Sequence, residues 1–206
     1  MKVLFQGDSI TDWGRSYDDA HLLGEGYVKY AAEAIKYRHP ETEFEFLNYG
    51  ISGNKVLDLV NRWQKECIDL QPDVVSILIG VNDVWHRAAT KEWLDNAVFE
   101  EQYRSILEDT KANTNAKIIM MEPYLAYTED KAFFREDLAP KIEVVRKLAR
   151  EYADSYIPLD GIIAAHSIKT APTYWCEDGV HPSEPGQRLI ARYYADAFDL
   201  IFASIK

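Results

Sequence analysis

The sequence predicts an α/β protein with a central parallel sheet of about five strands, and three observations support this. Short apolar runs alternate with longer segments that carry apolar residues at helical spacing. The run at residues 74–79 is apolar almost throughout, as expected for a strand covered by helices on both faces. The chain has 206 residues and shows no linker, internal repeat or low-complexity segment, so we expect a single domain, residues 1–206.

The expected elements follow one another in the order that βαβ units require. Strands are expected at residues 3–5, 44–47, 74–79, 118–121 and 156–159. Helices are expected at residues 26–37, 56–63, 99–112, 138–152 and 184–205. The first helix should end at His39-Pro40, because a proline shortly after the last periodic residue is a helix stop signal. Between these elements we expect loops, among them residues 8–12, 48–54, 80–83 and 174–183.

Charge and cysteine content make several classes of partner and site less expected. The net charge of −11 disfavours nucleic acid and anionic membrane surfaces as partners, because both attract basic patches. The two cysteines, Cys67 and Cys176, suggest neither a disulfide framework nor a zinc site. The chain enters its first strand directly after Met1, and no apolar stretch is long enough to span a bilayer, so we expect a cytoplasmic protein.

Polar loops follow the first three expected strands. Ligands bind at the carboxyl ends of the strands in open parallel sheets, so these loops should meet at one edge. Ser9 comes directly after the first strand, where Gly7 permits a sharp turn that exposes the hydroxyl. Such a serine is a candidate nucleophile if a base removes its proton. The alternative is an ordinary strand-to-helix turn in which Ser9 or Asp8 caps a backbone N–H.

His181 is the best candidate for this base among the five histidines, because Asp178 lies three residues before it. This spacing lets the carboxylate bind imidazole Nδ1 and leaves Nε2 free for the serine. The alternative is that Asp178 is only a helix cap and that His181 is a surface residue.

Acyl transfer also needs hydrogen-bond donors for the oxyanion that forms on the attacked carbonyl. The candidates are the backbone N–H groups of Ser9 and Gly53 and the side-chain amide of Asn82. Taken singly, Gly53 also fits a turn glycine, and Asn82 fits a turn at the end of a strand. Their order, each in a loop that follows a strand, favours a common site. Three charged residues near these loops are expected to support the site rather than react: Asp12, Arg15 and Asp83. The alternative for each is a solvated or purely structural role.

Four blocks resemble those of the SGNH, or GDSL-type, esterase and lipase superfamily. They are Gly7-Asp8-Ser9-Ile10, Asn48-x-Gly50-x-x-Gly53, Gly80-x-Asn82-Asp83 and Asp178-x-x-His181-Pro182, in the family's order and spread over nearly the whole chain. The resemblance implies a three-layer α/β/α, flavodoxin-like fold. It also implies a triad of Ser9, Asp178 and His181, an oxyanion hole of Ser9, Gly53 and Asn82, and no metal or cofactor.

Longer matches at residues 7–15, 50–54 and 79–85 are similar to the acetylxylan-esterase branch, whose members remove acetyl groups from short xylo-oligosaccharides. This resemblance implies a small acetylated sugar or oligosaccharide as the substrate and an acetyl-enzyme on Ser9. Two alternatives stay open. One is a lipid acyl hydrolase of the lysophospholipase or thioesterase type, and the other is a non-catalytic sugar-binding module.

Aromatic side chains in loops at the expected site are candidates for sugar contacts, since a ring face suits the apolar face of a sugar. We expect Trp85 and Trp175 to contact the substrate, and Trp13 and Tyr124 are further candidates. The alternative for each is packing in the core or at an interface. The many aromatics are also compatible with a homo-oligomer.

Overall fold

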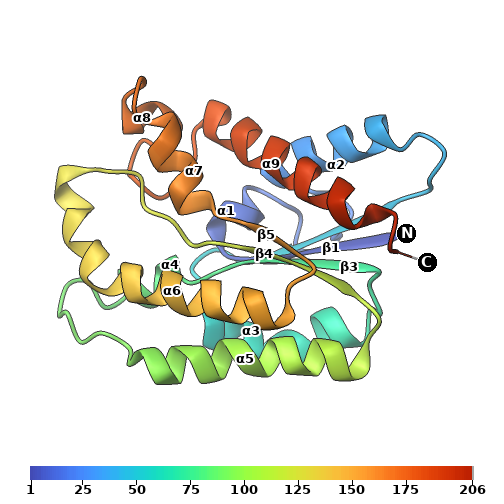
Figure 1. Ribbon diagram of the computed structural model, residues 1–206, viewed down its shortest axis with the longest axis horizontal. Coiled ribbons are helices and arrows are strands. Elements are labelled where there is room, and N and C mark those ends of the chain that lie inside the picture. Colours follow the sequence, from blue (N-terminus) through green and yellow to red (C-terminus); the bar gives the residue numbers. More distant parts are fainter. Residues whose placement is uncertain (206) are drawn as a thin grey trace.

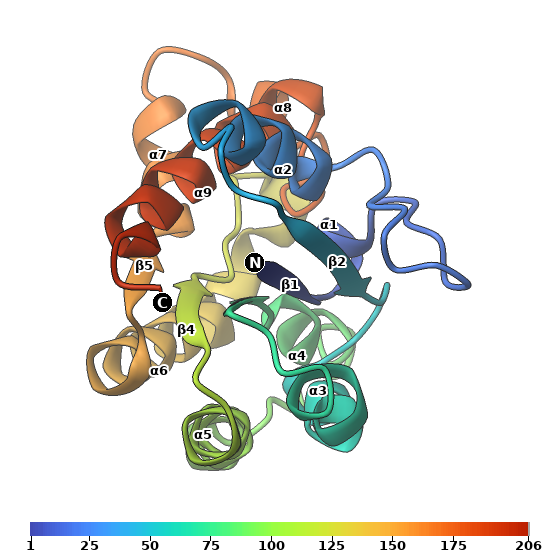
Figure 2. The ribbon, with the colours of Figure 1, turned by 90° about the vertical axis from the view of Figure 1, so that its right-hand side faces the viewer.

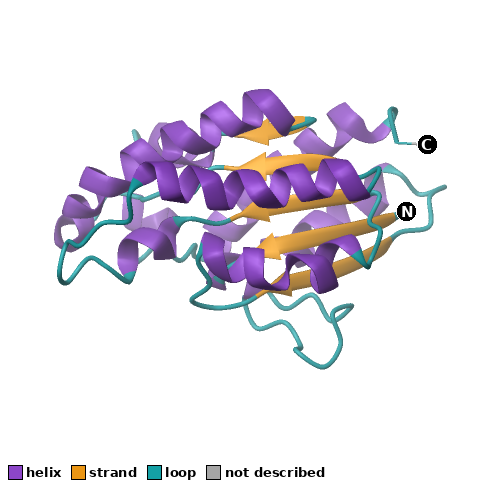
Figure 3. Ribbon diagram, turned by 90° about the horizontal axis from the view of Figure 1, so that it is seen from below, coloured by secondary structure: helices purple, strands orange, loops and turns teal. Residues whose placement is uncertain are grey.

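The computed structural model describes residues 1–205 and has three layers, with a sheet in the middle (Figure 1). The sheet has five strands in the order β2-β1-β3-β4-β5, and each neighbouring pair is parallel. The strands are β1 (Lys2–Gly7), β2 (Glu45–Gly50), β3 (Val74–Leu78), β4 (Lys117–Met121) and β5 (Ser155–Ile157). Their arrows all point the same way, and the N-terminus lies at the opposite end (Figure 3). The predicted parallel sheet and three-layer α/β/α fold are confirmed.

Helices cover both faces of the sheet (Figures 1 and 2). One face carries α2 (Tyr27–Arg38), α7 (Leu159–His166) and α9 (Glu184–Phe202). The other carries α3 (Val56–Trp63), α5 (Asn96–Asn113) and α6 (Arg135–Tyr152). A π-helical turn, η1 (Gln64–Ile68), continues α3. Four short helices lie toward the carboxyl ends of the strands: α1 (Ser9–Asp12), α4 (Val81–Trp85), the 3-10 helix η2 (Glu129–Phe134) and α8 (Pro172–Trp175).

The core is divided in two by the sheet, because successive residues of a strand point to opposite faces. Phe5 packs on the α2 and α9 side, where its ring lies 4.8 Å from that of Tyr194. Leu4 packs on the other side, in the same cluster as Trp63 of α3. Both strand residues are fully buried. This accounts for the nearly continuous apolar runs from which the strands were predicted.

Several loops and one strand of the sequence prediction are corrected by the structure. Of the residues expected as loops, 9–12 and 81–83 belong to the short helices α1 and α4, 48–50 belong to β2, and 174–175 are the end of α8. These helices have four or five residues, too few for an apolar period to be visible. The expected last strand ends before Pro158, and the following residues form α7. The final helix ends at Phe202 rather than at residue 205.

Strands β1, β2 and β3 end at the same edge of the sheet. Gly7 of β1 pairs with Gly50 of β2 and with Leu78 of β3. Helix α1 then packs against the end of β2 so closely that a Cβ at Gly50 would lie 2.3 Å from the Asp12 nitrogen. Glycine at this position therefore lets the serine-bearing helix reach the neighbouring loop.

Within residues 1–205, no helix combines the length and apolar composition needed to cross a membrane.

Candidate active site

Ser9, His181 and Asp178 form one hydrogen-bonded chain. The Ser9 hydroxyl lies 2.9 Å from His181 Nε2, and His181 Nδ1 lies 2.8 Å from Asp178 Oδ2. Ser9 begins α1, whereas the other two residues lie in the loop between α8 and α9. The fold thus brings together the three residues that the sequence predicted as a triad, in the connectivity that the Asp-x-x-His spacing suggested.

The Asp178 carboxylate is held in place by its own loop. Its Oδ1 accepts the backbone N–H groups of Val180, at 3.0 Å, and of His181, at 2.7 Å. Burial alone would raise the pKa of Asp178, but the His181 side chain and these N–H groups hold the pKa far below its usual value. In turn, the hydrogen bond to Asp178 raises the pKa of His181 above 6.5, against the opposing effect of burial.

The loop that carries the histidine is anchored from beneath by the segment after β4. The Tyr124 hydroxyl donates to the Val180 carbonyl at 2.8 Å, and the Ala126 N–H donates to the Gly179 carbonyl at 2.8 Å. Tyr124 is fully buried. Its expected contact with substrate is therefore corrected: this ring supports the His181 loop from the core and does not face a ligand.

A pocket of about 350 Å³ opens beside Ser9. It is lined by Ser9, Ser52, Gly53, Asn82, Trp85, His86 and His181. Gly53 has a φ of +81°, a conformation that favours glycine, at the third position of the Ile51–Asn54 turn. The Asn82 amide donates one hydrogen to the Asn54 carbonyl at 3.1 Å, which leaves its second hydrogen for a ligand. The three residues expected to supply the oxyanion donors, Ser9, Gly53 and Asn82, thus line one pocket together with His181.

A second hollow of about 390 Å³ lies on another side of the histidine. Its lining includes Trp13, Asp178 and His181 together with the carboxylates of Glu177 and Glu184. The Trp13 ring lies 6.1 Å from the His181 ring. This hollow combines an aromatic face with an excess of negative charge, and so suits an uncharged polar group better than an anion.

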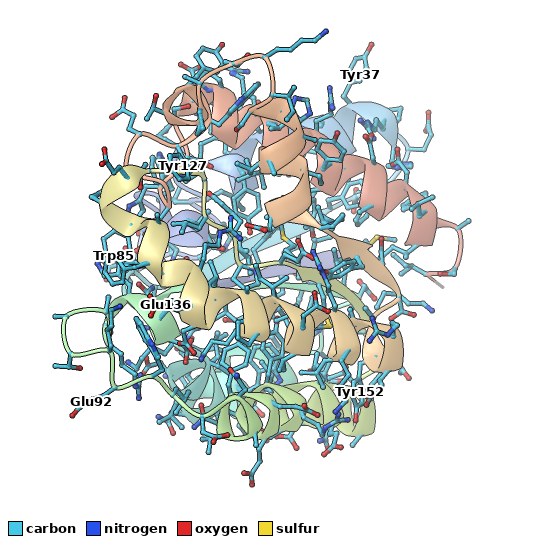
Figure 4. The ribbon with its side chains drawn as sticks, turned by 60° about the vertical axis from the view of Figure 1, so that its left-hand side comes forward. Tyr37, Trp85, Glu92, Tyr127, Glu136 and Tyr152 are labelled. Atoms are coloured by element: carbon cyan, nitrogen blue, oxygen red, sulfur yellow. The ribbon has the colours of Figure 1, made fainter. Side chains whose placement is uncertain are left out.

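The predicted aromatic contacts divide into two groups. Trp85 lines the first pocket, and its ring lies 5.7 Å from that of His181. Figure 4 labels Trp85 and Tyr127 toward one end of the molecule, away from Tyr37 and Tyr152. Trp175, by contrast, lines neither hollow, and its indole N–H donates to the His166 carbonyl at 3.3 Å. Its predicted place at the substrate is not supported by the geometry.

Ser52 and His86 line the first pocket but were not among the residues predicted from sequence. Ser52 lies inside the 48–54 loop that the sequence did single out, so its position could have been noted. His86 directly follows α4, a helix too short to be predicted, and nothing in the sequence indicated where its ring would point. Partial desolvation and the nearby Lys55 lower the pKa of His86 below its usual value, which disfavours the charged form of this ring.

Two buried carboxyl groups lie beneath the site and do not reach the pocket. Burial raises the pKa of Asp8 to about 7 and that of Asp83 to about 6. Asp8 caps α1 by accepting the Ile10 N–H, and Asp83 accepts the Val56 N–H at the start of α3. Both therefore support the site, as was expected for Asp83.

Across residues 1–205, no group of three or more His, Cys, Asp or Glu side chains is arranged to hold a metal ion.

Comparison with known proteins identifies the family. Over 201 residues the chain is 33% identical to an acetylxylan esterase of Geobacillus stearothermophilus, a match that covers 94% of this chain and 91% of that protein. A solved acetylxylan esterase structure from that organism matches with a TM-score of 0.85 and 32% identity, over 97% of this chain and 93% of the other. A solved protein of Parabacteroides merdae, assigned as a GDSL-like lipase, gives a TM-score of 0.86 and 35% identity over 97% and 95% of the two chains.

Catalytic mutants of the Geobacillus enzyme have also been solved. In them a serine, an aspartate or a histidine is replaced by alanine, and that aspartate precedes that histidine by three positions, as Asp178 precedes His181 here. A model of the GDSL-like lipase/acylhydrolase family matches residues 5–189. The protein is therefore a carboxylic ester hydrolase and belongs to the GDSL-like lipase/acylhydrolase family.

Proposed function

We propose that this esterase removes O-acetyl groups from carbohydrates, with short acetylated xylo-oligosaccharides as its substrates. The observation that carries the proposal is the chain from Ser9 through His181 to Asp178, at 2.9 and 2.8 Å, beside a pocket that also contains Gly53 and Asn82. These are the groups that acyl transfer by a serine nucleophile requires. The acetylxylan esterase that is 33% identical over 94% of the chain supports the substrate class.

In the first half of the reaction, Ser9 Oγ attacks the acetyl carbonyl carbon while His181 Nε2 takes the hydroxyl proton. Asp178 holds the imidazole so that Nε2 faces the serine and stabilises the positive charge that forms on the ring. The bond between the carbonyl carbon and the sugar oxygen then breaks. His181 gives the proton to that oxygen, the sugar leaves with a free hydroxyl, and the acetyl group stays on Ser9.

In the second half, water attacks the acetyl-enzyme and His181 accepts its proton. Acetate leaves, and the proton returns to the Ser9 oxygen. In both halves negative charge develops on the carbonyl oxygen. The N–H groups of Ser9 and Gly53 and the Asn82 amide would donate to it, and donors that are already in place need no reorganisation when the charge forms.

The charge around the site favours a sugar over a lipid or thioester with an anionic head group. The hollow beside His181 is lined by three acidic residues, Glu177, Asp178 and Glu184, of which Glu184 pairs with Arg188 at 2.9 Å, and the chain carries a net charge of −11. An uncharged xylose ring avoids the repulsion that a phosphate would meet there. We infer that Trp85 and Trp13 contribute the aromatic contacts with the sugar, in place of Trp175 and Tyr124.

The test is acetate release from acetylated xylo-oligosaccharides by the wild type and by Ser9→Ala, with Ser105→Ala on α5 as a matched serine control. We expect release by the wild type and the control and none by Ser9→Ala. Cleavage of 4-nitrophenyl acetate without release from the oligosaccharides would contradict the xylan assignment. Faster release of long-chain acids from lysophospholipids would favour a lipid hydrolase, and inactivity on every ester would favour a binding module.

A further inference from the structure

The Gly53 N–H depends for its direction on one short turn. Residues 51–54 form this turn, closed by the Asn54 N–H donating to the Ile51 carbonyl at 3.1 Å. With Gly53 at a φ of +81°, the Ser52–Gly53 peptide is the central peptide of the turn. Rotation of that peptide would redirect the Gly53 N–H. Ser52 supplies the carbonyl of that peptide, so bonds that hold Ser52 restrict the rotation that would redirect this donor.

Asp12 is the group that fixes Ser52. Its Oδ2 accepts the Ser52 backbone N–H at 3.0 Å and the Ser52 hydroxyl at 2.7 Å. The same oxygen accepts the Tyr17 hydroxyl at 2.5 Å. Asp12 is only 4% exposed, so these bonds are shielded from competing water. Burial alone would raise the pKa of Asp12, but the donors from Tyr17 and Ser52 hold it below its usual value and keep the carboxylate ionised.

Asp12 also joins the turn to the nucleophile, because it ends the short helix that Ser9 begins. Two further bonds tie the neighbouring parts together. Arg15 Nε donates to the Gly50 carbonyl at 2.6 Å, and the Asn82 amide donates to the Asn54 carbonyl at 3.1 Å. The three donors around the pocket therefore come from segments that are directly hydrogen-bonded to one another.

We propose that Asp12 is a positioning residue that aligns the oxyanion hole, by holding Ser52, which supplies the carbonyl of the Ser52–Gly53 peptide, so that the Gly53 N–H faces the carbonyl oxygen of the bound ester. The proposal rests on the proposed function, since it assigns a role within that reaction. Asp12 itself touches neither the nucleophile nor the base through any hydrogen bond of the described chain. Its effect should appear in the turnover of the bound ester rather than in substrate binding.

The kinetic test compares Asp12→Ala, Asp12→Asn and Tyr17→Phe on 4-nitrophenyl acetate. Asp12→Ala removes both bonds to Ser52, and kcat should fall by about ten- to a hundredfold with KM within about twofold. Asp12→Asn keeps one acceptor oxygen and should recover part of the loss, and it also serves if the alanine variant does not fold. Tyr17→Phe removes only the third bond to Oδ2, so its kcat should stay within about twofold of the wild type.

Two further readouts separate positioning from a general loss of structure. The acid limb of the pH profile should keep its midpoint in all three variants, because the His181–Asp178 pair is untouched. By NMR, the Ser52 amide of folded Asp12→Ala should exchange its hydrogen at least about tenfold faster than in the wild type and in Tyr17→Phe. Three results in Asp12→Ala would each overturn the proposal. They are a wild-type kcat, a rise in KM as large as the fall in kcat, and an unchanged exchange rate of the Ser52 amide.

The exchange rates also separate this proposal from the proposed function. A wild type with no esterase activity would reject the function, while the exchange of the Ser52 amide would still decide whether Asp12 holds the turn. An active wild type, with full activity in folded Asp12→Ala, would retain the function and reject the role of Asp12.

Discussion

The two sides of the candidate active site are built in different ways. On one side, Ser9, Gly53 and Asn82 each follow closely on the end of a strand, β1, β2 or β3, and these three strands are neighbours in the sheet. On the other side, Asp178 and His181 lie in a loop that comes only after α7 and α8. That loop takes its position from anchors such as the Tyr124 hydroxyl bond to Val180. The sheet therefore places the candidate nucleophile and the candidate oxyanion donors, whereas side-chain and backbone hydrogen bonds place the candidate base.

This difference predicts that mutations on the two sides affect activity and stability differently. A change among the strand-end residues should slow the reaction and leave the fold intact, because the sheet still sets the backbone. A change in the anchors of the histidine loop should cost stability as well. The variants below test this contrast, from the largest expected effect to the smallest.

The largest effect is expected for Asp178→Asn. Loss of the carboxylate leaves His181 without the partner that orients it, and kcat should fall by about ten-thousandfold. The pH profile checks the cause. His181 must be neutral to accept the Ser9 proton, and its raised pKa keeps it protonated to higher pH, so the wild type should lose activity as pH falls through a midpoint above 6.5. In the variant the midpoint should move to lower pH, and in Glu177→Gln, which makes no bond to the ring, it should stay in place. A wild-type midpoint in Asp178→Asn would contradict this assignment.

The next effect is expected on the strand side of the site. Asn82→Ala removes one donor from the candidate oxyanion hole and should lower kcat by about a hundred- to a thousandfold. KM and the midpoint of chemical denaturation should change little, since the backbone of α4 remains. Steady-state kinetics and urea unfolding measure the two quantities. Wild-type turnover in a folded Asn82→Ala protein would remove this residue from the reaction.

A smaller effect is expected at the rim of the pocket. Trp85→Ala should raise KM for acetylated xylo-oligosaccharides by about two- to tenfold, the range expected for one lost aromatic contact. The kcat for 4-nitrophenyl acetate should change little, because that ester has no sugar to bind. Trp175→Ala provides the comparison and should leave both values near the wild type. If Trp175→Ala raised KM and Trp85→Ala did not, the sequence prediction for Trp175 would be restored and the pocket described here would be wrong.

The smallest effect on rate, but a measurable one on stability, is expected for Tyr124→Phe. The variant loses the bond to the Val180 carbonyl and leaves that buried oxygen without its partner, which should lower the free energy of unfolding by about 1 to 2 kcal/mol. Tyr37→Phe is the matched control, since Tyr37 is 87% exposed and should tolerate the change. Urea denaturation measures both. Equal stabilities would mean that Tyr124 does not anchor the histidine loop.

The same contrast explains what the sequence could predict. Ser9, Gly53 and Asn82 are each marked by a strand end and a short motif, so their convergence follows from the order of three buried strands. The pairing of Asp178 with His181 could be predicted because the Asp-x-x-His spacing is local. One turn of backbone lets the Asp178 carboxylate bind both the ring and the N–H of His181. Neither inference needed the position of a distant loop.

The aromatic contacts could not be predicted in this way. Tyr124, Trp175 and Trp85 all lie in or near loops at the correct end of the sheet, and their sequences do not distinguish them. Only the packing turns Tyr124 into the core, Trp175 toward His166 and Trp85 toward His181. The short helices α1 and α4 escaped prediction for a related reason, since a single turn is set by its cap and its neighbours rather than by an apolar period.

The central claim, that Ser9 is the activated nucleophile, has a direct test. The wild type, Ser9→Ala and Ser105→Ala are incubated with a fluorophosphonate, and the modified peptide is identified by mass spectrometry. We predict stoichiometric labelling of Ser9 in the wild type and in Ser105→Ala, and none in Ser9→Ala. Labelling at another residue, or no labelling of a folded wild type, would contradict the account.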